Sequence, residues 1–196
     1  MYTDLKDKVV AVQGLGAVGY NICKHLHTEG AKLIVTDIVE EKVQQAVKEF
    51  GAKAVSSEEI YSVECDIFAP CSIGAVLNDK TIPQLKCEIV AGCANNVLED
   101  DQKHGDMLMN RGILYAPDFV INGAGLINVY QEFFPPYDRE ATLKKVEKIY
   151  DRLLKIFAYA KKHNINNQIA ANRIAEERIK LLKDIHANYV PNAKSL

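Results

Sequence analysis

The sequence predicts an α/β protein with a Rossmann-type, doubly wound parallel sheet followed by C-terminal helices. Two observations lead to this class. Short apolar runs alternate with helical patterns over the first two thirds of the chain, which is typical of a parallel sheet covered on both faces. A loop with three glycines follows the first apolar run, where such sheets bind nucleotides. We therefore expect a dinucleotide-binding core over residues 1–137 and a helical extension over residues 138–196.

Each expected element of the core has a local signal. The apolar runs that predict strands are residues 8–13, 32–37, 52–55, 66–69, 88–91 and 113–116. Helices are expected at residues 17–29, 40–50 and 102–111, and each is followed or closed by a glycine, namely Gly30, Gly51 and Gly112. Ser56 and Glu59 fit a capping box, which predicts that a further helix begins there.

The last third of the chain has a different pattern, with two helices and no strand from Asp138 onward. In the first helix, one apolar stripe recurs at steps of three and four: Leu143, Val146, Tyr150, Leu153, Phe157 and Ala160. The second, at residues 169–188, carries Ile174, Leu181, Leu182 and Ile185 among charged residues. Such stripes pack most simply on the sheet core, and for the final helix a partner domain is the alternative.

Composition narrows the classes of function. The 196 residues carry a net charge of −2, which argues against a nucleic acid or an anionic membrane as partner. No apolar run approaches the roughly 20 residues that span a bilayer, and no secretory leader is recognisable. The five cysteines form no C-x-x-C pair, so we predict neither a disulfide framework nor a metal site, and we expect a cytoplasmic protein.

The glycine loop has the context of a dinucleotide site. Gly14 permits the turn out of the strand, Gly16 lets a pyrophosphate approach the backbone, and Gly19 lets the following helix pack closely. The helix points its N-terminus at the phosphates. Asp37 ends the second strand and can accept both hydroxyls of the adenine ribose, so NAD is favoured over NADP. Two alternatives remain open, a plain strand-to-helix turn capped by Asp37 and the G-x-G loop of a methyltransferase.

Four separated blocks of the sequence carry a wider resemblance. They are KVVAVQGLGAVGYNICKHLHTEGAKLIVTDI, VECDIFAPCSIGAVLND, YAPDFVINGAGLINV and AANRIAEERI. In order and spacing they resemble the C-terminal half of the glutamate/leucine/phenylalanine/valine dehydrogenase family, and most of all its leucine dehydrogenase-like members. The resemblance implies a subunit that passes hydride to NAD while an L-amino acid is deaminated to a 2-oxo acid and ammonia, in a cleft between two domains.

The resemblance also implies roles for particular residues. The loop from Gly14 to Gly19 would hold the pyrophosphate and the end of the second strand the adenine ribose, while later segments would flank the nicotinamide. The cofactor-binding residues so implied are Gly14, Leu15, Gly16, Ala17, Val18, Gly19, Asp37, Ile38, Ala69, Cys71, Cys93, Ala94, Asn96 and Asn122. Asn96 would also contact the substrate, whose side chain would lie against an apolar wall formed by Leu126 and Val129 on the following helix.

The substrate pocket departs from the leucine-type pattern. Cys93 and Asn95 stand where that pattern has serine and leucine, and the pair Asn95-Asn96 is closer to the phenylalanine-type loop. Tyr130 stands where a small residue is common. We therefore expect an apolar or aromatic amino acid and leave open which one.

The family's catalytic lysine lies in a glycine-rich motif of its N-terminal domain, and this sequence has no Gly-Gly pair. We therefore predict no catalytic residue in this chain, which would bind NAD but not turn over alone. The whole enzyme would be a homo-oligomer that meets its substrate through the other domain. A standalone NAD(H)-binding sensor or docking module is the alternative, and upstream sequence with a glycine-rich lysine motif would decide for the enzyme.

Overall fold

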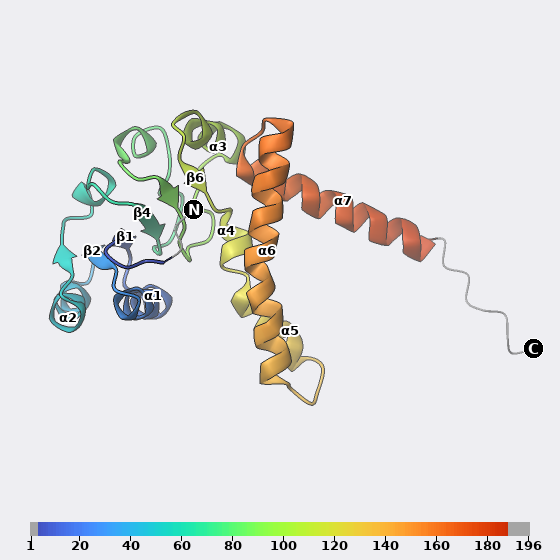
Figure 1. Cartoon of the computed structure of the whole chain (residues 1–196), viewed down its shortest axis with the longest axis horizontal. Helices are drawn as coiled ribbons and strands as arrows, with labels where there is room; N and C mark the ends of the chain where they lie inside the picture. Colours follow the sequence, from blue (N-terminus) through green and yellow to red (C-terminus); the bar gives the residue numbers. More distant parts are fainter. Residues whose placement is uncertain (1–3, 188–196) are drawn as a thin grey trace, which may run out of the picture.

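Six short parallel strands form one sheet in the order β3-β2-β1-β4-β5-β6. The computed structural model describes residues 4–187 (Figure 1). The strands are β1 (Val9–Gln13), β2 (Lys32–Thr36), β3 (Lys53–Ala54), β4 (Ile67–Pro70), β5 (Ile89–Val90) and β6 (Leu114–Tyr115). The order reverses between β1 and β4, which confirms the doubly wound Rossmann class.

Alternate residues of β1 point to opposite faces of the sheet and are buried in two separate hydrophobic cores. Val10 and Val12 are buried with residues of α1 (Ala17–Thr28) and α2 (Glu40–Phe50), which cover one face of the sheet. Ala11 is buried on the other face, under α3 (Asp101–Asn110) and the 3₁₀ turns η1 (Glu59–Tyr61) and η2 (Ile82–Gln84). Burial on both faces explains why the strands read as continuous apolar runs in the sequence.

The expected elements are all present, although several have different bounds. The runs at 52–55, 88–91 and 113–116 contain strands of only two residues each, and the run at 66–69 gives a strand that extends to Pro70. The capping box is formed, since the Glu59 N–H donates to Ser56 Oγ and the Glu59 carboxylate accepts from the Ser56 N–H. The Ser56 N–H and hydroxyl both donate to the Glu59 carboxylate and lower its pKa. The helix that the box opens is a single 3₁₀ turn.

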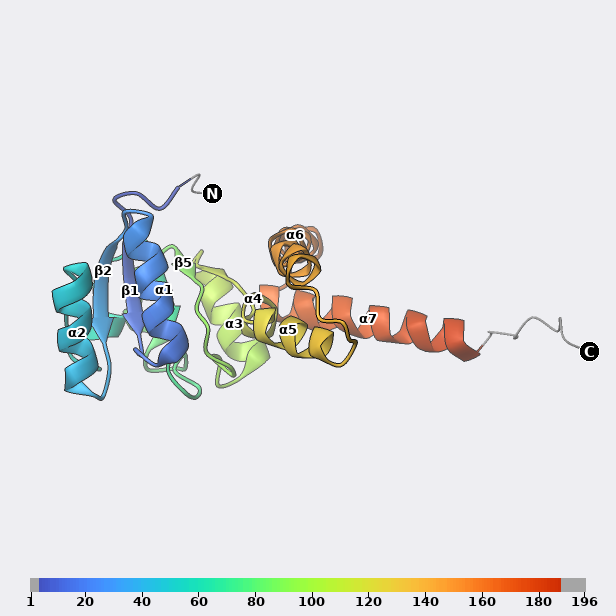
Figure 2. The same ribbon diagram turned by 90° about the horizontal axis from the view of Figure 1, so that it is seen from below.

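Four helices follow the sheet: α4 (Asp118–Ile121), α5 (Ala124–Glu132), α6 (Arg139–His163) and α7 (Asn167–Ala187). Asp138 caps α6 by accepting a hydrogen bond from the Ala141 N–H at 3.0 Å. In Figure 1 α6 runs beside the β6 edge of the core, and in Figure 2 the far half of α7 extends away from the sheet. No helix within residues 4–187 has the length and apolar character needed to cross a membrane.

The apolar stripes of α6 and α7 are only partly covered. Ile156 and Ala160 of α6 are buried against Ala170 and Ala171 of α7. Farther from this contact the expected burial fails, because the exposed apolar side chains include Leu143, Tyr150, Leu181 and Leu182. The expected helix end at Asn188, and the extension beyond it to residue 196, lie outside the described residues.

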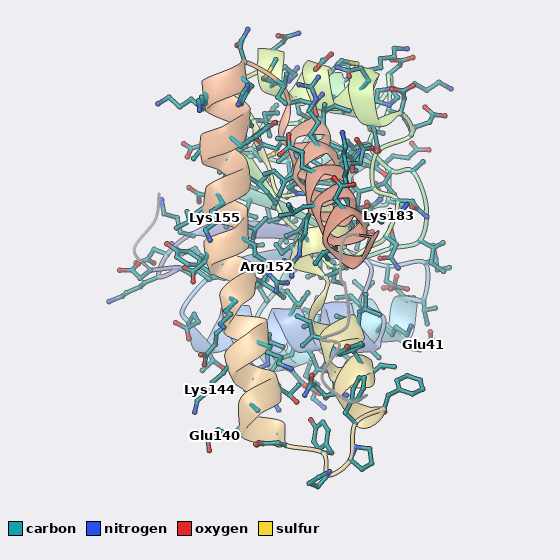
Figure 3. All side chains as sticks on the ribbon, turned by 90° about the vertical axis from the view of Figure 1, so that its right-hand side faces the viewer. Glu41, Glu140, Lys144, Arg152, Lys155 and Lys183 are labelled. Atoms are coloured by element: carbon teal, nitrogen blue, oxygen red, sulfur yellow. The ribbon has the colours of Figure 1, made fainter. Side chains whose placement is uncertain are left out.

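Several charged side chains of α6 are exposed, and Figure 3 labels four of them: Glu140, Lys144, Arg152 and Lys155. Glu140 and Lys144 form an ion pair at 2.7 Å one turn apart, and Arg152 and Lys155 follow farther along the helix. Both side chains of the pair are exposed, and such an exposed pair contributes little to stability.

Asn166 connects the turn between α6 and α7 to α3. Its buried side chain donates to Asp106 Oδ1 at 2.7 Å and accepts from the Ile169 N–H at 2.9 Å. We expect Asn166→Ala to lower the free energy of unfolding by about 2 kcal/mol, because it removes these two bonds and a third, from Nδ2 to Gln102 O at 3.3 Å. Urea unfolding checks this, with Asn110→Ala, an exposed residue at the end of α3, expected to change stability by less than about 0.5 kcal/mol. Equal effects of the two changes would contradict this role.

Candidate functional site

The carboxyl ends of the parallel strands β1, β2, β4 and β5 meet at one edge of the sheet, where the strand order reverses. The glycine loop between β1 and α1 crosses this edge, because it follows Gln13 directly. The loop is tied to its neighbours by two backbone bonds, from the Gly14 N–H to Thr36 O at 2.8 Å and from the Cys71 N–H to Gln13 O at 2.7 Å. Ligands of open α/β sheets bind at such a switch point.

The three glycines have three different surroundings. Gly14 has a φ of +101°, and a Cβ there would lie 2.8 Å from the backbone of Cys71 and Ser72. A Cβ on Gly19 would lie 2.1 Å from the Gly14 carbonyl oxygen. A Cβ on Gly16 would meet no atom within 4 Å. The fold itself therefore requires glycine at positions 14 and 19, whereas Gly16 leaves open space in front of the loop.

The N-terminus of α1 faces that open space without a side-chain cap. The first helical hydrogen bond runs from the Tyr20 N–H to Gly16 O at 2.9 Å, so the preceding amides of the first turn have no partner within the helix. Residues 16–19 line a cavity of about 500 Å³ together with Cys71, Cys93, Ala94, Asn95 and Asn96. Free amides and the helix dipole make this cavity suited to an anion such as a pyrophosphate.

Asp37 links the end of β2 to the glycine loop. Its carboxylate accepts hydrogen bonds from the Leu15 N–H at 2.5 Å and the Val39 N–H at 2.9 Å. Asp37 and Ile38 also line a second cavity, of about 490 Å³, with Gly14 and Gly16. Ile38 is 94 % exposed and Ile73, on the same cavity, fully exposed. The cavity thus combines a carboxylate with apolar side chains that could flank a planar ring.

Several polar residues of the second cavity were missed by the sequence analysis, among them Lys42, Ser57 and Gln13. Lys42 lies in the first turn of α2. It follows Val39 by three residues and so lies on the same side of the helix, which is the sequence signal that could have placed it near Asp37. Gln13 donates from Nε2 to the Tyr61 hydroxyl at 2.6 Å, while its buried Oε1 has no hydrogen-bond partner. This oxygen is a free acceptor beside the cavity.

The loop after β5 and the turn before α5 form the other side of the site. Asn122 Nδ2 donates to Ala94 O at 3.3 Å and to Asn95 Oδ1 at 2.5 Å. Asn96 has a φ of +53°. A third cavity, of about 760 Å³, lies between α1 and α5, and its lining includes Val18, Cys93, Asn122, Gly123 and Leu126.

The structure brings most of the predicted site residues to these three cavities, with three exceptions. Leu15 and Ala69 are buried in the core, and the Leu15 N–H is already taken by Asp37. Val129 is exposed on α5 nearly one turn beyond Leu126 and does not line the third cavity. Leu126, at 77 % exposed, does line it.

Comparison with known proteins shows the family of this chain. The model of the glutamate/leucine/phenylalanine/valine dehydrogenase family matches residues 1–186. Leucine dehydrogenase of Bacillus cereus is 55 % identical over 193 residues, 98 % of this chain and 52 % of that protein. Phenylalanine dehydrogenase of Lysinibacillus sphaericus is 45 % identical over 180 residues, 89 % of this chain and 47 % of that protein.

A solved structure gives the same result. The crystal structure of L-tryptophan dehydrogenase from Nostoc punctiforme superimposes with a TM-score of 0.88 at 50 % identity, covering 91 % of this chain and 54 % of that chain. The chain thus spans about half the length of the curated relatives it matches. On its fold, its site and these matches, this chain belongs to the glutamate/leucine/phenylalanine/valine dehydrogenase family.

Proposed function

We propose that this chain is the NAD-binding part of an amino-acid dehydrogenase that deaminates an apolar or aromatic L-amino acid. The observation that carries the proposal is the meeting of the open Gly16 loop, the uncapped start of α1 and the Asp37 carboxylate at one switch point. The named activities of the relatives, on leucine, tryptophan and phenylalanine, support the substrate class.

The chain's own residues would hold the cofactor in an extended form across the sheet edge. The amides of residues 17–19 would bind the pyrophosphate in front of Gly16, and Asp37 would accept the hydroxyls of the adenine ribose. The adenine ring would lie between the apolar side chains of Ile38 and Ile73. Cys71, Cys93 and Asn122 would flank the nicotinamide, which when bound accepts hydride from the substrate.

The proposed preference for NAD rests on charge near the ribose. The Asp37 carboxylate would repel a 2′-phosphate, which also offers it no hydrogen-bond donor. The unmodified ribose, in contrast, offers hydroxyl donors to the carboxylate. Lys42 in the same cavity partly offsets this repulsion. We therefore propose a preference for NAD that is clear but not absolute.

The amino-acid substrate would enter the third cavity from the side of α5. Asn96 would donate a hydrogen bond toward the substrate, and Leu126 supplies apolar surface at the cavity mouth. Val129 would join this wall only where another domain closes over α5, because it lies outside the cavity in this chain. We propose that the whole enzyme is a cytoplasmic homo-oligomer whose other domain completes this cleft.

We expect the chain alone to bind NADH without turnover. The family resemblance places the catalytic lysine in the other domain, where a desolvated amine would serve as acid and base, and no lysine lines the third cavity in the described part of the chain. The test is NAD reduction with L-leucine, L-phenylalanine and L-tryptophan, with Bacillus cereus leucine dehydrogenase as the positive control. Measurable NADH formation by the chain alone would contradict this part of the proposal.

A further inference from the structure

Two cysteines lie opposite each other where β4 and β5 end. Phe68 pairs with Val90 in the ladder, and Cys71 and Cys93 each stand three residues beyond this pair. Past the strands the chains stay in contact, since the Ala94 N–H donates to Pro70 O at 3.0 Å. Neighbouring strands lie about 4.8 Å apart, within the Cα separation of about 4.4–6.8 Å that a disulfide spans.

The two side chains lie side by side, since Cys71 and Cys93 line the same cavity. Interaction with Cys71 lowers the pKa of Cys93, while interaction with Cys93 and burial raise the pKa of Cys71. Both side chains line the cavity in front of Gly16, so a small reagent can reach them. Cys23 on α1 is buried in the core behind them, and burial raises its pKa to about 12.

We propose that Cys71 and Cys93 form a redox-active dithiol, which a hydroperoxide converts into an intrachain disulfide that weakens NADH binding. In the first step the Cys93 thiolate attacks one peroxide oxygen, the O–O bond breaks and hydroxide leaves, giving a sulfenic acid. The Cys71 sulfur then attacks the Cys93 sulfur, the S–O bond breaks, and the Cys71 proton leaves with the oxygen as water. One disulfide and two waters result from two thiols and one hydrogen peroxide.

The expected effect of the disulfide on NADH binding follows from the packing of Cys71 against the glycine loop. Its backbone lies within van der Waals contact of Gly14, where a Cβ would come to 2.8 Å from the Cys71 carbonyl carbon. Movement of Cys71 toward Cys93 is therefore transmitted to the glycine loop, since close-packed atoms shift together. The disulfide also ties together the two segments that form the cavity floor. This half of the inference rests on the proposed NAD site, whereas formation of the disulfide does not.

A second pair, Cys65 and Cys87, provides an internal control. Each precedes its strand by two residues, so they lie opposite each other at the far end of β4 and β5. Interaction between their thiols likewise raises the pKa of Cys65 and lowers that of Cys87. Cys65 lines a shallow cavity with Glu64 and Lys86, away from the glycine loop. Oxidation of this pair would leave the NADH cavity untouched.

The experiment treats the full chain with stoichiometric hydrogen peroxide, maps disulfides by non-reducing peptide mass spectrometry, and titrates NADH by fluorescence before and after. We expect a peptide cross-linked through Cys71 and Cys93, and an NADH dissociation constant that rises about fivefold or more. Dithiothreitol should restore the original value. Saturating NADH should slow formation of the cross-link, because cofactor bound in this cavity would keep the peroxide from the two cysteines that line it.

Two variants separate the cysteine pairs, and each is compared with its own reduced form. Cys93→Ser should form no cross-link at Cys71 and show no peroxide effect on NADH affinity, whereas Cys87→Ala should keep both. Peroxide treatment without a Cys71–Cys93 cross-link, or a cross-link with unchanged affinity, would overturn the inference. If the reduced chain binds no NADH, the proposed function and the effect on affinity both fail, and peptide mapping still decides whether the dithiol forms.

Discussion

Gly16→Ala should lower the affinity of the chain for NADH by about 100-fold and leave its fold intact. The added methyl group meets no protein atom within 4 Å, so it would project into the space that we propose for the pyrophosphate. The backbone at Gly16, with φ −64° and ψ −177°, is accessible to alanine. The free energy of unfolding should therefore change by less than about 1 kcal/mol. NADH titration and urea unfolding of the same preparation measure both quantities.

Gly19→Ala is the matched control with the opposite expectation. Its Cβ would lie 2.1 Å from Gly14 O and 3.1 Å from the Cys71 Cβ, so α1 must move away from the sheet. We expect a loss of about 2–3 kcal/mol in the free energy of unfolding, as overpacking of a close contact typically costs. The proposed role of the open space at Gly16 would be contradicted if Gly16→Ala lost as much free energy of unfolding as Gly19→Ala, or if it bound NADH with the parent's affinity.

Asp37→Ser should weaken NADH binding by about 10-fold or more and leave NADPH binding unchanged or stronger. The change removes a charged acceptor for the ribose hydroxyls and the negative charge that repels a 2′-phosphate. Calorimetric titration with both cofactors measures the ratio of affinities. Equal affinity of variant and parent for NADH would show that Asp37 does not contribute to NADH binding.

Asp37 also supports the loop, through its bonds to the Leu15 and Val39 amides, so a second variant is needed to isolate the effect of charge. Lys42→Ala leaves those bonds in place and removes the cation beside the same cavity. It should lower the residual affinity for NADPH and change that for NADH little. A loss of NADH affinity alone would show that Lys42 acts in another way.

Much of the fold could be predicted because its causes are local. Strands buried on both faces appear in the sequence as apolar runs. Gly14 marks the turn out of β1, Gly19 the close contact of α1 with that turn, and Asp37 the end of β2. The ends of the strands are predicted less accurately, because pairing with a neighbouring strand determines them. Only two residues each of β5 and β6 are paired.

The rest of the site depends on contacts between distant segments. Lys42 and Ser57 join Asp37 only because α2 and the start of η1 converge on the end of β2, which periodicity does not reveal. The proximity of Cys71 and Cys93 depends in the same way on the register of β4 and β5. Leu15 and Ala69 show the reverse: the family motif includes them, yet their side chains belong to the core.

The stripes of α6 and α7 show why helical patterns alone did not predict burial. Ile156 and Ala160 are covered because Asn166 holds the turn between the helices on α3. Leu181 and Leu182 lie farther along α7 and remain exposed among the described residues. An apolar stripe specifies that a helix has a partner surface, but not which part of the protein supplies it.

The central claim is that the switch-point cavities of this chain bind NAD, and calorimetric titration of the reduced chain with NADH and with NADPH tests it most directly. We expect one NADH to bind per chain and NADPH to bind more weakly. Absence of heat with NADH, or an equal or higher affinity for NADPH, would contradict it.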